Sequence, residues 1–150
     1  MDVPLQPRLF SLREANAMLV TLQEQFARAR ELRDQLLLAQ QKLAETGREI
    51  EGPEIEVDPQ APPAVQKLQQ RAADVIEKLR ALLKEVTEMG VEVKAADGLV
   101  DFRSKLHGRT VYLCWKFGEE RITHYHDLET GFSGRRPLPA DGDFTGDFLH

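Results

Sequence analysis

Two long segments of the chain repeat apolar residues at alternating intervals of three and four. The first spans residues 9–46, and its repeat consists of Leu12, Ala15, Leu19, Leu22, Phe26, Ala29, Leu36 and Leu43. The second spans residues 62–89, and its repeat consists of Val65, Leu68, Ala72, Val75, Leu79, Leu82, Val86 and Met89. On a helix this spacing forms one apolar stripe, as in the heptad pattern of coiled coils. We therefore expect a long antiparallel helical hairpin that resembles a coiled coil.

Both segments carry the signals that begin and end a helix. Ser11 and Glu14 have the spacing of a capping box, in which each side chain accepts a hydrogen bond from the other residue's backbone N–H. Gly47 and Gly90 follow the two repeats and suit the left-handed conformation that often ends a helix. The residues between the helices, 47–61, are rich in acidic residues and are expected to form a solvated linker.

Two features of the first helix favour a partner for the hairpin. Arg33 and Gln40 fall in its apolar stripe, and polar residues there specify register and partner in coiled coils. At about 1.5 Å per residue, the first helix would be roughly 50 Å long and the second roughly 40 Å long. Part of the first helix would then lack cover from the second. Self-association, or a protein partner bound through the hairpin, would supply that cover.

After Gly90 the apolar period changes to two, which is the period of strands. The segments VEVKA, GLVDF, RTVYLCWKF and ERITHYH predict a small, mainly antiparallel sheet over residues 91–126. Residues 127–150 are rich in glycine and proline and are expected to form an irregular tail. The predicted fold is therefore one α+β domain over residues 1–150, with the helical hairpin packed on the sheet.

The register of the last predicted hairpin decides which way its histidines face. A two-residue turn at residues 118–119 places His126 opposite Val111. Because strand side chains alternate, His124 and His126 would then lie on the apolar face that packs against the helices. Cys114 would lie on the opposite face.

Composition excludes several classes of protein. The formal net charge of −5 argues against a nucleic-acid-binding surface. The single cysteine, Cys114, excludes an internal disulfide and a zinc site of several cysteines. No basic start with an apolar run marks a signal peptide, and no apolar segment reaches the roughly 20 residues of a membrane helix. We expect a cytoplasmic protein that binds neither nucleic acid nor membrane.

The stretch HYHDLE gathers candidate ligands for a divalent metal. His124, His126, Asp127 and Glu129 lie close together in the sequence, and Asp101 could reach them from a neighbouring strand. Imidazole and carboxylate are the usual metal ligands where cysteine is scarce. The spacing matches no established metal motif, so two alternatives stay open. The histidines could belong to the core or cap an element, or a His–Asp pair could act in acid–base chemistry.

Two further candidates have plain structural explanations. Cys114 has no histidine nearby in the predicted register, so we expect a buried, inert thiol. Arg135 lies in the glycine-rich segment GFSGRRPL and could hold a carboxylate or phosphate. The segment does not connect a strand to a helix as phosphate loops do, and its arginines could equally pair with acidic residues of the surface.

The segments FSLREAN, GLVDF, VYLCWKFGEERI and YHDLETGFSGRRPL resemble DUF2203, a bacterial domain family of unknown function. The resemblance covers residues 9–138 and supports the order of a helical hairpin followed by strands. It implies like residues in the family at Asp101, Cys114, Trp115, Glu119, His126, Gly131, Phe132 and Arg135. His124 departs from the family pattern, which leaves His126 as the better candidate ligand. Asp101, Glu119, His126 and Arg135 could line one ligand pocket or form the hydrogen-bonded scaffold of the sheet.

Two functions are consistent with these observations. The first is a non-enzymatic interaction or scaffold module that uses its helical hairpin. The second is a metal- or small-ligand-binding protein with its site centred on His126 at the end of the β-hairpin. The sequence identifies no catalytic residue and favours a protein that is not an enzyme.

Overall fold

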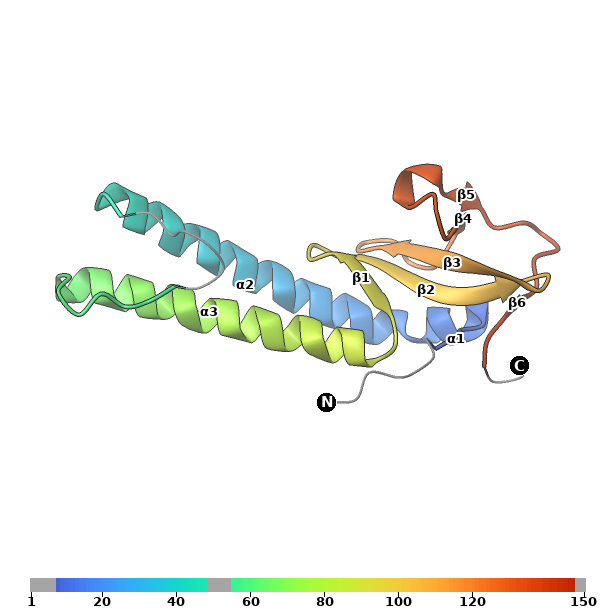
Figure 1. Ribbon diagram of the computed structural model, residues 1–150, viewed down its shortest axis with the longest axis horizontal. Coiled ribbons are helices and arrows are strands. Elements are labelled where there is room, and N and C mark those ends of the chain that lie inside the picture. The colour runs from blue at the N-terminus through green and yellow to red at the C-terminus, as the bar shows by residue number, and fades with distance from the viewer. Residues whose placement is uncertain (1–7, 49–54, 148–150) are drawn as a thin grey trace. The chain divides into compact units, whose positions relative to one another are not determined.

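The computed structural model describes residues 8–48 and 55–147 and has an α+β fold, with helices and a sheet whose strand pairs are antiparallel (Figure 1). The chain divides into two compact units, which are described separately below. Unit 1 consists of Met1–Phe26 and Glu85–His150, and unit 2 is Ala27–Lys84. Within the described ranges, none of the helices combines the length and the apolar composition that crossing a bilayer requires.

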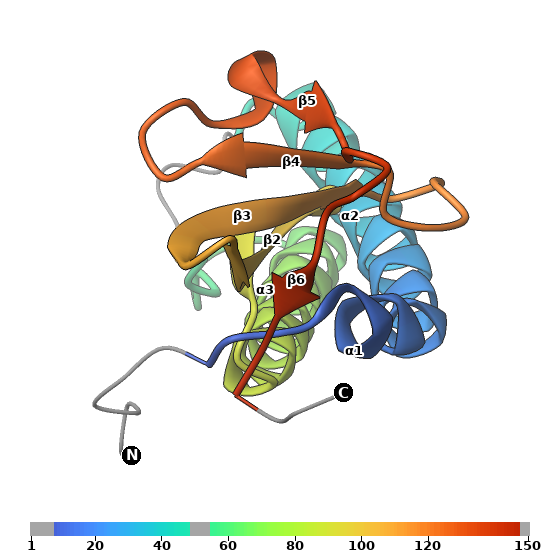
Figure 2. The ribbon, with the colours of Figure 1, turned by 90° about the vertical axis from the view of Figure 1, so that its right-hand side faces the viewer.

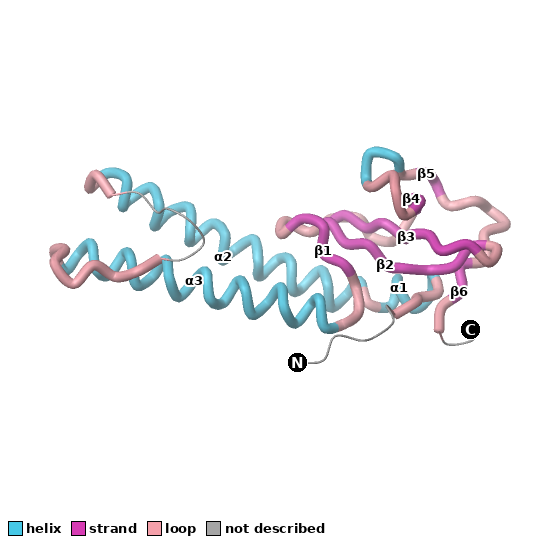
Figure 3. The backbone as a smooth tube through the Cα atoms, in the orientation of Figure 1, coloured by secondary structure: helices cyan, strands magenta, loops and turns pink. Residues whose placement is uncertain are grey.

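The chain contains a short first helix, α1 (Leu12–Ala17), and a long second helix, α2 (Leu19–Glu45) (Figure 3). The predicted capping box is confirmed: Ser11 Oγ accepts from Glu14 N at 3.1 Å, and Glu14 Oε1 accepts from Ser11 N at 2.9 Å. The helical region expected over residues 9–46 is divided, because α1 ends at Ala17 with Met18 as its C-cap and α2 begins at Leu19.

Helix α3 (Pro63–Glu88) has 26 residues and α2 has 27. At about 1.5 Å per residue, both helices are roughly 40 Å long. The predicted difference in length between the two long helices is therefore wrong, because the N-terminal turns of the first segment form the separate helix α1.

The buried stripe of α2 differs from the predicted one. Leu32 and Ala39 are each only 2% exposed, whereas Arg33 is exposed and Gln40 is half-buried. The prediction that Arg33 and Gln40 occupy the apolar stripe is wrong. Burying a guanidinium group without a partner is costly, and a shift of one position replaces both polar residues with apolar ones.

Unit 2 has its own apolar cluster, formed by Leu43, Ala61 and Val65 with Leu68 packed against it. Among the described residues of unit 2, polar contacts stabilise the connection between α2 and α3. Arg48 Nη1 lies 2.8 Å from Asp58 Oδ2, and the buried Gln69 accepts through Oε1 from Asp58 N at 2.9 Å. Residues 49–54 of the predicted acidic linker lie outside the described residues.

Unit 1 contains the sheet, with the strand order β1-β2-β3-β4-β5 and β6 paired with β2. Figure 2 shows β5, β4, β3 and β2 in this succession. The strand bounds are β1 Glu92–Ala95, β2 Leu99–Leu106, β3 Arg109–Lys116, β4 His124–Asp127, β5 Arg136–Pro137 and β6 Phe144–Thr145. The tail predicted as irregular therefore contributes β5 and β6, because both segments fill hydrogen-bonding positions beside longer strands.

One face of the sheet, here called the inner face, packs against the N-terminal part of unit 1. The ring of Phe10 makes an edge contact with Phe102 at 5.3 Å, and the ring of Phe26 lies 6.1 Å from that of Trp115. Trp115 and Phe102 are fully buried. Phe10 N also donates to the carbonyl of Arg103 at 2.7 Å, so the segment before α1 is fixed to β2.

The register of β3 and β4 differs from the predicted one by one residue. Tyr112, not Val111, pairs with His126, and Cys114 pairs with His124. The two strands are joined by residues 117–123 instead of a two-residue turn. A shift of one residue exchanges the faces of a strand, so His124 and His126 lie on the face of Cys114, opposite the inner face.

Side-chain contacts stabilise this longer loop. Glu119 accepts through its carbonyl oxygen from Trp115 Nε1 at 2.9 Å and through Oε1 from Lys116 N at 2.7 Å. At the far end of the loop, Ile122 N donates to Asn16 Oδ1 at 2.9 Å. The loop backbone is thereby bonded to both β3 and α1, which fixes where β4 begins.

Replacing Gly98 with alanine should destabilise unit 1. Gly98 has φ +113°, and a Cβ there would lie 2.3 Å from Phe117 Cβ, so the substitution combines backbone strain with a clash. We expect Gly98→Ala to lower the free energy of unfolding by more than the roughly 1–3 kcal/mol that backbone strain alone costs. Urea denaturation measures this change. Gly118→Ala is the control, because Gly118 has φ +103° but no atom lies within 4 Å of the position that a Cβ would take there. Equal losses in the two variants would contradict the steric argument.

Candidate functional site

The outer face of the sheet carries a buried polar cluster from three adjacent strands. Register places Asp101 on β2 opposite Cys114 on β3, while His126 on β4 lies opposite Tyr112. Asp101 and His126 are each 2% exposed and Cys114 is fully buried. Because these strands are hydrogen-bonded neighbours, their backbone pairing brings the three side chains together.

The contacts of His126 fix the orientation of its ring. Nδ1 lies 2.8 Å from the backbone carbonyl oxygen of Asp127, which can only accept, so Nδ1 carries a proton and donates. Nε2 lies 3.0 Å from both carboxylate oxygens of Asp101. The imidazole thus presents Nε2 to Asp101, and the pair shares a proton in a buried setting.

Burial dominates the electrostatics of this cluster. Desolvation raises the pKa of the Asp101 carboxyl, while the hydrogen bond and charge of His126 oppose the rise. Desolvation also raises the pKa of the Cys114 thiol from 9.0 to about 11, and the Asp101 charge adds to that rise. The thiol is therefore protonated at neutral pH and is a poor nucleophile as it stands.

Two other predicted pocket residues form a separate ion pair beside the cluster. Arg135 Nη2 lies 3.2 Å from Glu119 Oε2, and the guanidinium also stacks 4.4 Å from the centroid of the Phe132 ring. The Arg135 guanidinium acts to lower the pKa of the Cys114 thiol, against the effect of burial. Charges of both pairs, Asp101 with His126 and Glu119 with Arg135, thus influence Cys114.

Of the four predicted metal ligands within HYHDLE, His126 belongs to the buried cluster, together with Asp101, which the sequence offered as a further ligand from a neighbouring strand. The half-buried His124 has its Nδ1 2.8 Å from Thr123 Oγ1. The Asp127 carboxylate is ion-paired with Arg136 at 3.0 Å and lies 3.5 Å from Arg109. Glu129 is exposed.

Among the residues that the structure describes, a different set could hold a metal ion: Asp101, Cys114 and His126, with one ligand atom from each lying within 4.8 Å of the others. The sequence placed Cys114 on the face opposite the histidines because a two-residue turn was assumed. With the longer connection of residues 117–123, the same strand alternation places Cys114 on the face of His124 and His126.

A pocket of about 330 Å³ opens over this cluster. Asp101 and His126 line its deep side, since both are buried, and Cys114 does not line it. Leu99, Tyr112, Leu128 and Phe132 supply apolar and aromatic walls. Lys94, Glu129 and Thr130 line it as well, so the pocket combines charged and polar groups with apolar walls, as ligand sites do.

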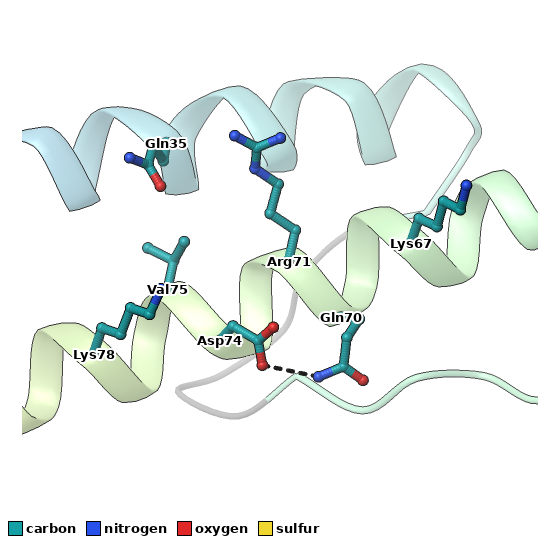
Figure 4. A pocket seen from close by; sticks show the side chains of 7 residues that line it. All are labelled: Gln35, Lys67, Gln70, Arg71, Asp74, Val75 and Lys78. Atoms are coloured by element: carbon teal, nitrogen blue, oxygen red, sulfur yellow. Dashed lines mark hydrogen bonds between the residues drawn. The ribbon is translucent and has the colours of Figure 1, made fainter.

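A second hollow, of about 440 Å³, lies in unit 2 beside α3 (Figure 4). Its charged side chains, those of Lys67, Arg71, Asp74 and Lys78, are all exposed or half-buried. Gln70 Nε2 donates to Asp74 Oδ1 at 2.9 Å within the same helix. None of the polar residues that line this hollow is buried. Long, solvated side chains do not hold a ligand in a defined geometry, so the outer-face pocket of unit 1 is the stronger candidate.

The chain belongs to the DUF2203 family of uncharacterized conserved proteins, whose model matches residues 8–138. The match includes the cluster of Asp101, Cys114 and His126 together with Glu119 and Arg135. Comparison with curated proteins and with solved structures gave no significant match.

Cys114 of the folded protein should react slowly with iodoacetamide. Its pKa of about 11, against 9.0 for an ordinary thiol, leaves about 100-fold less thiolate at any pH below both values. Burial should slow the reaction further. The rate is measured at pH 8 by mass spectrometry, and the same chain unfolded in urea is the control because it contains no other cysteine. Similar rates in the folded and unfolded chain would contradict the buried, protonated thiol.

Proposed function

We propose that this protein binds a small ligand in the outer-face pocket, in contact with Asp101 and His126. The observation that supports the proposal best is the buried pair of these two side chains at the deep side of the pocket. An ionisable pair taken out of water contributes little net stability, since desolvation offsets much of its attraction. Burial raises the pKa of the Asp101 carboxyl, and a perturbed ionisable group in a hollow is typical of functional sites.

The chemistry of the pocket indicates the class of ligand. The Asp101 oxygens have accepting capacity beyond the one N–H of His126, because each oxygen has two lone pairs. Lys94 also lines the pocket, but its ammonium lies 3.0 Å from Glu92, so its charge is compensated. The pocket therefore favours a cation or a molecule with an N–H or O–H donor, and its walls suit an apolar part.

Primary amines, amidines and nitrogen heterocycles should bind this pocket in a fragment screen. We expect chemical-shift changes in ¹H–¹⁵N spectra at Tyr112, His126 and Gly131, because these residues line the pocket. Leu128→Ala should weaken binding roughly 10-fold, since it removes part of an apolar wall. Leu38→Ala on α2 is the matched control, with 49% exposure against 47% for Leu128. Chemical-shift changes confined to unit 2, or an equal loss of affinity in Leu128→Ala and Leu38→Ala, would refute ligand binding in this pocket.

An interaction role for the helices is the second candidate function. In this proposal α2 and α3 form an antiparallel, coiled-coil-like hairpin that binds a second copy of the chain. The supporting observation is that Leu37 and Leu38 on α2 are 46% and 49% exposed, although they are large apolar side chains. Exposing two adjacent leucine side chains to water is unfavourable, and association would bury them.

If the helices self-associate, the double change Leu37→Glu and Leu38→Glu should convert the oligomer to a monomer. The added charges would have to be buried at the interface without partners. The mass is measured by size-exclusion chromatography with light scattering, and Arg33→Glu is the control because Arg33 is exposed on the same helix. A wild-type monomer over the accessible concentration range would refute this second function.

A further inference from the structure

We infer that Asp101, Cys114 and His126 together bind a divalent transition-metal ion of the zinc class. The inference rests on the proposed function in that it names the ligand of the same site. It also changes the ligand set expected from the sequence, since Cys114 joins His126 and Asp101 while His124, Asp127 and Glu129 lie outside the set.

The three side chains supply the atoms that zinc prefers. Thiolate sulfur, imidazole nitrogen and carboxylate oxygen are its standard ligands, at about 2.0–2.3 Å from the ion. Ligand atoms around a tetrahedral ion are then roughly 3.3–3.8 Å apart. The atoms of this cluster lie within 4.8 Å of one another, so shifts on the order of 1 Å bring them to bonding positions.

The ring of His126 is already oriented for a metal at Nε2. Its Nδ1 proton is donated to the Asp127 carbonyl oxygen at 2.8 Å, which leaves Nε2 as the ring atom that faces Asp101. A ligating histidine characteristically donates its other N–H to a backbone carbonyl or a carboxylate, which fixes the ring and its tautomer. The same contact holds the ring here.

Charge balance also suits a divalent ion. The Asp101 carboxylate and the Cys114 thiolate together carry two negative charges, which the ion neutralises within a buried site. Arg135 adds no uncompensated cation, because it is ion-paired with Glu119 at 3.2 Å. Binding would release the proton of the Cys114 thiol, because the metal ligand is the thiolate.

The pocket gives the ion an open position. Three protein ligands leave the fourth tetrahedral position free, as in zinc sites that take water or an external ligand. Asp101 and His126 line the pocket of about 330 Å³ and Cys114 does not, so we expect this free position on the side of the pocket. Buried metal sites that serve only stability are usually closed by four protein ligands.

The test is a titration of the full chain with Co²⁺ after EDTA treatment and under reducing conditions. We expect one equivalent to bind, with a thiolate-to-cobalt charge-transfer absorption in the near ultraviolet, and Zn²⁺ should displace it. Cys114→Ser should abolish that absorption and weaken Co²⁺ binding by more than the roughly 10- to 100-fold typical of losing an outer-shell partner. His124→Ala is the matched control and should leave both unchanged, because His124 lies outside the cluster.

A second measurement needs no variant and therefore does not depend on how a substitution folds. Adding Zn²⁺ to the metal-free wild type in weak buffer should release protons, that of the Cys114 thiol among them, and absence of any release would overturn the metal site. Absence of the charge-transfer absorption, or Co²⁺ binding of equal strength in Cys114→Ser, would overturn the metal site. If the metal site fails but fragments still bind in the presence of EDTA, the proposed ligand pocket stands without the metal.

Discussion

The pairing of β3 with β2 on one side and β4 on the other is the constraint on which the rest of unit 1 depends. Backbone hydrogen bonds fix this register, and strand alternation then assigns every side chain to one of two faces. Trp115 goes to the inner face, where Phe26 contacts it, and Cys114 goes to the outer face with Asp101. A shift of a single residue would exchange these two surroundings, placing an indole in the polar cluster and a thiol in the aromatic core.

The outer face shows how a sheet can hold ionisable groups away from water. Neither Asp101 nor His126 is tolerated alone in such a setting, because an unpaired buried charge is costly. The two side chains satisfy each other across β3, and Asp127 provides the backbone carbonyl that fixes the imidazole. The segment of Phe132 and Arg135 lies beside the cluster and adds the ion pair with Glu119. The result is a buried, hydrogen-bonded polar pair that lines a pocket.

The two proposed functions belong to different units and do not compete. The ligand and metal proposals use only side chains of unit 1, whereas the interaction proposal uses Leu37 and Leu38 in unit 2. The interaction proposal rests on fewer observations than the sequence suggested. The polar residues expected within the apolar stripe do not lie there, since Arg33 is exposed and Leu32 is buried instead. What remains is the exposed pair of leucines.

Local signals in the sequence determined the capping box of Ser11 and Glu14, the apolar stripe of α3 and the existence of strands after Gly90. Each depends on residues within a few positions of one another, where propensity and periodicity act directly. The loop between β3 and β4 was decided by the tertiary structure, since its length depends on contacts of Glu119 with Trp115 and of Ile122 with Asn16. Asn16 is far from this loop in sequence, so no local pattern could reveal the contact. The proximity of Cys114 to Asp101 and His126 follows from that loop, because only the folded register places the thiol on the same face as the imidazole.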